Sequence, residues 1–430
     1  MSESSKNTAA FGTMVARRTI RIELRSCERP DRPRNSHERH TMQHVATDDT
    51  WTLWGTPHSL YTGKIRSYLI KRGVPFREMC PPHHRFREVI RPAIRLRVAP
   101  VMETPDGLII QDTSDMIDHL EANHPAPSMI PQTPLQCAVA WLIGAFGSEG
   151  LLPAAMSYRW SYRAQQEGFL RAEFGRGVYS GPSREDRNSA GLKLMDYFNN
   201  FLPSLGVTAE TQGLVETAYL ELLDVLDVHF QHFPYLLGGR PSIADCGLMA
   251  PLYAHLARDP VPATIMKNAA PNVYRWTERM NLANTIDGEF PDCPPQYLTD
   301  DALAPTLEPL LRLIFQDWGP ELLANASIYN QWVNANPDLP AGHLVSQSAE
   351  RTVHPTLGPI SYVQRGQRMQ RYSAPHALWH FDRAAAKARA LTGAAAAQFD
   401  QIVKRHGGES TMAISLARPM VRRDCVLVLA

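Results

Sequence analysis

The chain has 430 residues, of which 44% are hydrophobic and 20% are charged, and its 44 Lys and Arg residues almost balance 43 Asp and Glu residues. This length exceeds one ordinary domain of about 100–200 residues, and the composition is that of a globular protein with a sizeable core. The balanced charge gives no indication of a nucleic-acid or membrane-surface partner. No run approaches the ~18 consecutive apolar residues of a membrane span, so we expect neither kind of partner.

Six cysteines lie far apart and show no metal-ligand spacing, which favours free thiols in a reducing, cytoplasmic compartment. Residues 1–48 are polar and Arg-rich and lack the apolar stretch of a secretory signal. Acidic residues within them argue against an organelle transit peptide. We expect a disordered leader, or a start assigned too early with Met42 as the alternative.

Residues 49–125 alternate short strand patterns with amphipathic helices. The helix from Leu60 to Arg72 is ended by Gly73 and Pro75. Pro92 interrupts residues 83–98, which are expected to be irregular or weakly helical. The other expected elements are strands at 51–55 and 76–80, two short strands within 100–112 around the turn Pro105-Asp106-Gly107, and a helix at Ser114–Asn123. The pattern predicts an α/β unit.

Residues 133–284 carry long apolar-periodic segments without a convincing strand, after a proline-dense connector. The expected helices of this all-α bundle domain are Leu135–Glu149, Tyr158–Phe174, Asn188–Leu205, Ala209–Phe233, Ile243–Leu256 and Ala270–Asn281. Residues 285–430 form a C-terminal extension that we expect to be mainly α. It contains a loop at 286–305, one or two helices within 307–336, a possible hairpin within 356–375 and a strong helical propensity in 376–407.

Ser59 stands directly before the helix that begins at Leu60. Its hydroxyl could cap that helix by accepting a first-turn N–H, which contributes about 0.5–2 kcal/mol. It could also hold a thiol, because a hydroxyl donor and the positive end of a helix favour a thiolate, whose ordinary pKa is about 8.5. The two roles are compatible, and His58 and Tyr61 are the alternatives if Ser59 points away.

Three motifs in chain order resemble the cytosolic glutathione S-transferase superfamily: SLYTGKIRSYL from Ser59, VAPVMETPDGLIIQDTSDMIDHLE from Val98, and LLGGRPSIADCGLMAPLY from Leu236. The resemblance covers about Trp51 to Asn284 and implies a thioredoxin-like N-terminal domain followed by the helical domain. It places Ser59 where zeta- and theta-like transferases keep serine and omega-like ones keep cysteine. Serine favours reactions in which glutathione itself is the nucleophile over thiol exchange.

The resemblance also implies a glutathione site. Pro100 matches the family's cis-proline, with the backbone of Ala99 pairing with the cysteinyl backbone of glutathione. Asp112 and Thr113, which could equally cap a helix, stand where the family binds the γ-glutamyl end, at a helix N-terminus suited to a carboxylate. Arg97, with Arg95 as the alternative, is our candidate for the glycyl carboxylate, although the surrounding arginines also fit a solvated face.

Aromatic residues in the first two helices of the bundle could be core or could line an acceptor pocket. We expect Trp141, Tyr158 and Trp160 to contact an apolar substrate. Ser242 and Asp245 form a capping-box pattern with a structural role. His376 and His380, four residues apart, could bind a metal, but no third or fourth ligand is evident. We therefore expect a packing helix there and no metal.

The sequence thus predicts a glutathione transferase in which glutathione, as co-substrate, is activated by Ser59 for attack on a small apolar electrophile. By resemblance we expect a homodimer. The alternative is a non-catalytic ligand-binding or assembly protein of the same fold, which the long extension favours.

Overall fold

The computed structural model describes residues 49–283 and 288–430. The prediction of a leader at residues 1–48 lies outside this part of the chain. These described residues belong to one compact unit. The boundaries expected near residues 125–133 and 284 within it therefore stay predictions.

A four-stranded sheet forms the N-terminal part of this unit, as predicted. Its strands are β1 (Trp51–Trp54), β2 (Phe76–Met79), β3 (Val101–Glu103) and β4 (Ile109–Gln111). Their order is β2-β1-β3-β4, with β1 parallel to β2, and β3 antiparallel to both β1 and β4. The βαβ start and the antiparallel hairpin confirm the thioredoxin-like architecture.

The helices of this part begin and end at the residues that the sequence marks. Helix α1 (Leu60–Arg72) is capped by Ser59 and ended by Gly73, whose φ of 69° is the left-handed conformation that glycine adopts freely. Helix α3 (Thr113–Asn123) follows β4 directly. The proline-interrupted segment contains only a π-helical turn at Phe86–Ile90 and the short α2 (Arg91–Ile94).

The helical part follows, with eight α-helices in the described residues up to 283. They are α4 (Pro134–Ala145), α5 (Leu152–Trp160), α6 (Arg163–Val178), α7 (Arg184–Asn199), α8 (Gln212–His232), α9 (Ile243–Pro251), α10 (Pro260–Ala269) and α11 (Pro271–Met280). The π turns η2 (Phe146–Gly150) and η4 (Leu252–Ala257) continue α4 and α9 directly, and the 3-10 turn η3 (Pro203–Leu205) lies between α7 and α8. The helix expected at Tyr158–Phe174 is wrong as one element, because the chain breaks between α5 and α6.

The capping box of α9 is present as predicted. Ser242 N donates to Asp245 Oδ2 at 2.9 Å, and the Ser242 hydroxyl accepts from Ala244 N at 3.2 Å. Asp245 also accepts from Leu236 N and Trp276 Nε1. Because this buried carboxylate has four donors, it joins the start of α9 to α11 and to the loop before it.

The extension is mainly helical, as expected, and adds two small hairpins. Its elements are η5 (Pro305–Leu307), α12 (Glu308–Leu313), η6 (Ile314–Trp318), α13 (Gly319–Ala335), β5 (Pro359–Gln364), β6 (Gln367–Tyr372), α14 (Pro375–Arg389), α15 (Gly393–Arg405), α16 (Glu409–Met412), β7 (Met420–Arg423) and β8 (Val426–Leu429). The β5–β6 hairpin confirms the expected one, whereas β7–β8 was not foreseen.

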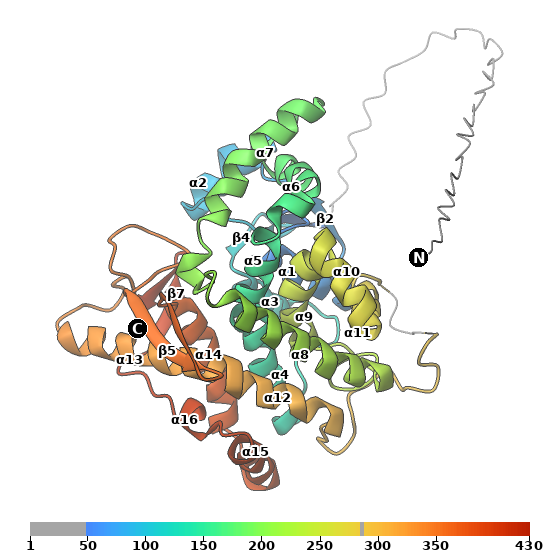
Figure 1. Cartoon of the computed structure of the whole chain (residues 1–430), viewed down its shortest axis with the longest axis vertical. Helices are drawn as coiled ribbons and strands as arrows, with labels where there is room; N and C mark the ends of the chain where they lie inside the picture. Colours follow the sequence, from blue (N-terminus) through green and yellow to red (C-terminus); the bar gives the residue numbers. More distant parts are fainter. Residues whose placement is uncertain (1–48, 284–287) are drawn as a thin grey trace, which may run out of the picture. The chain divides into compact units, whose positions relative to one another are not determined.

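The extension is part of the same core as the N-terminal sheet. Val426 and Val428 of β8 pack in one buried cluster with Trp54 of β1 and Val101 of β3. Helix α14 lies against α4 (Figure 1). The two contacts bring α14 and the β7–β8 hairpin to the edge of the sheet where α1 and α3 begin.

One helical segment, Pro134–Trp160, is long and apolar enough to cross a membrane by length and composition alone. Within the structure, 72% of its most apolar stretch is buried. This degree of burial is that of the central helix of a folded core.

Candidate functional site

Three segments of the N-terminal part meet at one edge of the sheet because of the strand register. Trp54, the last residue of β1, pairs with Val101, the first residue of β3. Val101 in turn pairs with Gln111, the last residue of β4. The turn that ends at Ser59, the Ala99-Pro100 dipeptide and Asp112 therefore lie together, and the Ala99-Pro100 bond is cis, as predicted.

Ser59 caps α1 in the structure. Its Oγ accepts a hydrogen bond from Thr62 N at 3.4 Å, and its backbone is extended, with φ −87° and ψ 127°. The side chain is half-buried. A hydroxyl that accepts one bond still has its own hydrogen to donate, so capping leaves Ser59 able to donate to a sulfur at the positive end of α1.

Arg159 of α5 holds the turn that precedes Ser59. Its Nη1 donates to the carbonyl oxygen of His58 at 2.8 Å. The guanidinium also forms two hydrogen bonds with Asp259, of 2.6 and 2.9 Å, and one with the carbonyl oxygen of Ala254 at 3.0 Å. Arg159 and Asp259 are almost fully buried, so this ion pair fixes the backbone of the candidate site from inside the bundle.

The two alternatives to Ser59 are engaged elsewhere. His58 is buried against Phe174, with ring centroids 4.3 Å apart, and burial together with Arg159 lowers its pKa well below the ordinary value. Tyr61 donates to Glu149 Oε1 at 3.2 Å, and burial together with Glu149 raises the pKa of its hydroxyl. The hydroxyl hydrogen of Tyr61 is already donated to Glu149, and the His58 ring is buried, so Ser59 is the better candidate to face a thiolate.

Asp112 begins α3 in an uncommon conformation. Its φ is 82°, a positive value that few non-glycine residues adopt. One carboxylate oxygen, Oδ1, accepts from Ser114 N at 2.8 Å. The other, Oδ2, lies 3.2 Å from His376 Nε2 and 3.7 Å from Arg422 Nη1. Two side chains of the extension thus occupy the carboxylate oxygen that the sequence assigns to a ligand, while Thr113 is buried beside it.

A buried polar cluster surrounds this contact. His376 Nδ1 lies 3.6 Å and His380 Nε2 3.7 Å from Glu149 Oε1, and Arg422 also contacts Asp115 and Gln111. Burial alone would lower the pKa of His376, but its contacts with Asp112 and Glu149 raise it to about 9. His376 is therefore positively charged near pH 7 and offsets one of the two negative charges of Asp112 and Glu149.

The protonation of His376 makes stability depend on pH. Because its folded-state pKa of about 9 is above the unfolded value of 6.5, its contribution is complete below pH 6.5 and is lost as the pH rises through 9. Its charged or titratable neighbours are Asp112, Glu149, His380, Lys64, His354 and Arg422.

The stability lost in His376→Gln is the unfolding free energy of wild type minus that of the variant. We expect this loss to be about 3 kcal/mol larger at pH 6.5 than above pH 9. Denaturant titrations at the two pH values measure this difference. His406→Gln, which removes a histidine 3.0 Å from Glu308, is the matched control. If the two proteins differ in unfolding free energy by the same amount at both pH values, His376 is not the protonated group that we assign.

A basic cleft of about 800 Å³ opens beside the cis-proline. Arg97 and Val98, which directly precede Ala99, line it together with residues 350–354 of the extension. Its basic residues are Arg87, Arg91, Arg95, Arg97, Arg351 and His354, against one acidic residue, Glu350. Among residues 49–283 and 288–430, the side chains of Arg87, Arg91 and Arg97 form no hydrogen bond or ion pair. The cleft therefore offers unpaired positive charge to a ligand.

The aromatic residues expected to contact a substrate do not lie together at this edge. Tyr158 and Trp160 are 2% and 3% exposed and pack against Tyr219 and Phe174, respectively. Trp141 is half-buried beneath Arg383 of α14, 4.7 Å from its ring centroid. None of the three lines the basic cleft. The structure gives Tyr158 and Trp160 the position of core residues, because the bundle closes around them.

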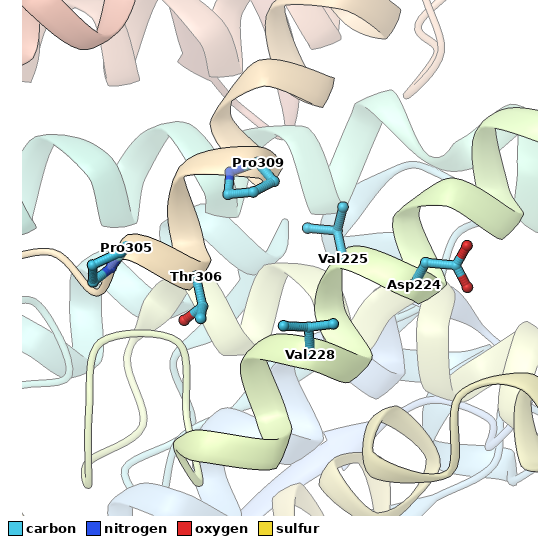
Figure 2. A pocket seen from close by; sticks show the side chains of 6 residues that line it. All are labelled: Asp224, Val225, Val228, Pro305, Thr306 and Pro309. Carbon is cyan, nitrogen blue, oxygen red and sulfur yellow. The ribbon is translucent and has the colours of Figure 1, made fainter.

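A second, apolar cleft lies between α8 and residues 305–309. Val225 and Val228 of α8 face Pro305, Thr306 and Pro309 across it (Figure 2). Its volume is about 490 Å³. Because no predicted site residue lines it, this cleft is separate from the candidate site.

Several residues of the site could not be found from the sequence. Glu149 was expected only as the end of a helix, and Arg159 and Arg422 carried no motif. The one available signal was the spacing of His376 and His380, which places both on one face of a helix. Their partner Asp112 is 264 residues away from His376, so that spacing alone could not identify it.

Two family descriptions match the chain. The N-terminal domain of glutathione S-transferases matches residues 53–128, and the C-terminal domain matches residues 208–279. Neither match covers the region beyond residue 280. No curated protein matches the chain.

Solved structures show distant likenesses. A glutathione S-transferase from Methylobacterium radiotolerans in complex with glutathione sulfonate is 20% identical, with a TM-score of 0.33, covering 59% of this chain and 100% of that one. The β-etherase LigF from Sphingobium sp. is 17% identical, with a TM-score of 0.38 and coverages of 56% and 98%. A tau-class glutathione S-transferase from mango, Mangifera indica, is 15% identical, with a TM-score of 0.33 and coverages of 57% and 95%. At this distance the likenesses carry no argument about activity.

Proposed function

We propose that this chain, which contains the N- and C-terminal domains of the glutathione S-transferase superfamily, is a glutathione transferase that uses Ser59 to stabilise the thiolate of glutathione. The observation that carries the proposal is the meeting of Ser59, Ala99-Pro100 and Asp112 at one sheet edge. The Ser59 hydroxyl donates to the sulfur, the backbone of Ala99 pairs with the cysteinyl backbone, and Asp112 with Thr113 binds the γ-glutamyl end. The proton of the thiol leaves to solvent, and the sulfur attacks an electrophilic carbon, whose leaving group departs with the electron pair of the broken bond.

Because His376 and Arg422 already contact Asp112, glutathione can bind this carboxylate only by displacing a side chain of the extension. The ammonium group of glutathione has the same charge as the protonated His376 ring and must replace it beside Asp112 Oδ2. The proposal therefore requires the extension to move at this point. A non-catalytic ligand-binding role is the alternative that the same contact favours, because the carboxylate is already neutralised.

The basic cleft suggests that the electrophile carries an acidic group. The sequence favoured an apolar substrate, but the aromatic residues assigned to it lie away from the cleft, whereas unpaired arginines line it. An anionic group on the substrate, together with the glycyl carboxylate of glutathione, would pair with Arg91 and Arg97. Electrostatic attraction in such an open cleft falls with salt, since the Debye length is about 8 Å at 0.15 M.

Turnover with a matched pair of electrophiles tests the proposed activity. We expect wild type to conjugate glutathione to 4-chloro-3-nitrobenzoate with a higher kcat/KM than to its methyl ester, and we expect added NaCl to reduce this preference. Each exposed charge pair contributes about 0.2–1 kcal/mol, so Arg91→Ala with Arg97→Ala lowers kcat/KM for the acid by about 2–30-fold. Arg184→Ala, at an exposed arginine of α7, is the control.

The results of this assay distinguish catalysis on an anionic substrate from non-catalytic ligand binding. A preference for the ester that salt does not change contradicts the anionic substrate. Retention on immobilised glutathione without turnover of either compound supports the non-catalytic alternative. We also propose that the protein is a homodimer and that it is cytoplasmic.

A further inference from the structure

Two histidines of α14 face a carboxylate of the N-terminal part at the contact between the extension and α3. His376 and His380 lie four residues apart, which places them on the same face of the helix. Their ring centroids are 4.7 Å apart. One donor atom each from Asp112, His376 and His380 lie within 4.8 Å of one another. The extension and the start of α3 thus bring together three side chains that commonly ligate transition metals.

We propose that Asp112, His376 and His380 form a binding site for one divalent transition-metal ion of the zinc class. The ion links α14 of the extension to the N-terminus of α3. The proposal requires only these three side chains and their orientation, so its test needs no glutathione. An ion bound to Asp112 would compete with the γ-glutamyl end of glutathione for this carboxylate.

The distances are close to those that zinc requires. Zinc bonds to nitrogen or carboxylate oxygen are about 2.0–2.2 Å long, so two tetrahedral ligand atoms lie about 3.4 Å apart. Asp112 Oδ2 and His376 Nε2 are already 3.2 Å apart. The other separations in the set are at most 4.8 Å, so they must shorten by no more than roughly 1.4 Å to reach the tetrahedral value. Three protein ligands leave a fourth position for water.

Glu149 supplies the outer contact that metal-bound histidines usually make. When His376 binds the ion through Nε2, its Nδ1 faces Glu149 Oε1 at 3.6 Å. A carboxylate in this position fixes the ring orientation and makes the histidine a better ligand. Tyr61 donates to the same oxygen of Glu149 at 3.2 Å, so the orienting carboxylate is itself held in place.

The local charge also leaves room for a cation. The carboxylates of Asp112, Asp115 and Glu149 face two fixed cations, Lys64 and Arg422. Arg422 directs its Nε and Nη2 atoms to Asp115 and Gln111 and lies farther from Asp112, at 3.7 Å. A divalent ion at Asp112 Oδ2 would add positive charge beside these carboxylates, and its binding requires the neutral form of both histidines.

Metal titration of the full chain tests the site. Untagged protein is stripped with a chelator, dialysed, and titrated with Zn²⁺ by calorimetry and with Co²⁺ by visible absorbance. We expect one ion per chain and the absorption of a four-coordinate Co²⁺ site with nitrogen and oxygen ligands. Trp379, whose ring centroid is 5.5 Å from that of His376 and 4.9 Å from that of His380, should show quenched fluorescence on Co²⁺ binding.

Variants locate the ion. His376→Ala, His380→Ala and Asp112→Asn should each abolish the one-ion step. Glu149→Gln should weaken the affinity by about 10–100-fold, as loss of an outer-shell partner does. His406→Ala removes a histidine that also contacts a carboxylate, Glu308, and should bind as wild type does.

Two results overturn the proposal. Wild type that binds no ion, or that gives only the spectrum of six-coordinate Co²⁺ in water, removes the site without reference to any variant. Unchanged binding in His380→Ala places the ion elsewhere, for example at the adjacent His83 and His84. Circular dichroism of each variant shows whether a loss of binding reflects loss of the fold. If a variant does not fold, the Co²⁺ spectrum and the Trp379 fluorescence of wild type decide whether the site exists.

Discussion

Asp259→Ala is expected to lower the unfolding free energy by about 3–5 kcal/mol, because it leaves the guanidinium of Arg159 buried without a carboxylate. Arg159 is 2% and Asp259 0% exposed. Their two hydrogen bonds, of 2.6 and 2.9 Å, form a bidentate pair that water cannot replace. Equilibrium unfolding in guanidinium chloride measures the loss.

The same substitution should disturb the candidate site. Arg159 Nη1 holds the carbonyl oxygen of His58, so an Arg159 side chain that moves toward water releases the turn before Ser59. Turnover of the folded variant should therefore fall together with stability. Glu167→Ala, which breaks the exposed pair of Arg171 and Glu167, is the control, and its cost should be at most about 0.5 kcal/mol.

A double variant separates charge from packing. Arg159→Met with Asp259→Leu leaves no buried charge and should recover part of the stability that Asp259→Ala loses. If Asp259→Ala lowers the unfolding free energy by less than about 1 kcal/mol, Arg159 reaches solvent in the folded protein, which contradicts its burial in the structure.

Ser59→Ala is expected to lower kcat/KM for glutathione conjugation by about 10–150-fold. A hydrogen bond to a charged group contributes about 1.5–3 kcal/mol, and each 1.4 kcal/mol is a factor of ten. The variant also loses a helix cap, which costs about 0.5–2 kcal/mol of stability. The two effects must be separated, because the hydroxyl of Ser59 has both roles in this account.

Ser183→Ala provides the separation. Ser183 caps α7 by accepting from Asp186 N at 3.2 Å and is half-buried, like Ser59. Its loss should cost similar stability and leave turnover unchanged. Ser59→Cys should turn the site toward thiol exchange through a mixed disulfide. Equal turnover of Ser59→Ala and wild type would remove Ser59 from the chemistry.

The parts of the fold that local residues determine were predictable. Ser59 and Gly73 mark the ends of α1 by a cap and by a left-handed glycine, and both were visible in the sequence. The β5–β6 hairpin was also anticipated, and its turn contains Gly366, with φ 80°. Caps, turns and apolar periodicity act within a few residues, so they can be inferred without the rest of the chain.

Elements that lack these signals were missed. The β7–β8 hairpin turns at Asp424-Cys425, both with positive φ, where glycine or asparagine would ordinarily indicate the turn. The break between α5 and α6 at Ser161 and Tyr162 contains neither glycine nor proline. Tyr162 is instead fixed by its contact with Glu216 of α8 at 2.8 Å, which only the tertiary structure reveals.

The residues of the candidate site also fall into those that the sequence indicates and those that it does not. The sequence and its resemblance indicated Ser59, Ala99-Pro100 and Asp112, because each lies at the end of a strand or the start of a helix. They could not indicate His376 or Arg422 as partners of Asp112, since these contacts join residues about 260 to 310 positions apart. Such contacts arise from the packing of β8 against the sheet and of α14 against α4.

The titration of glutathione bound to the protein tests the central claim most directly. The ultraviolet absorbance of the thiolate is followed as a function of pH with wild type and with Ser59→Ala. We predict a midpoint for wild type below the ordinary thiol pKa of about 8.5, and a return toward that value in Ser59→Ala. A wild-type midpoint equal to that of free glutathione, or the same lowered midpoint in both proteins, would contradict the assignment of Ser59 to the sulfur.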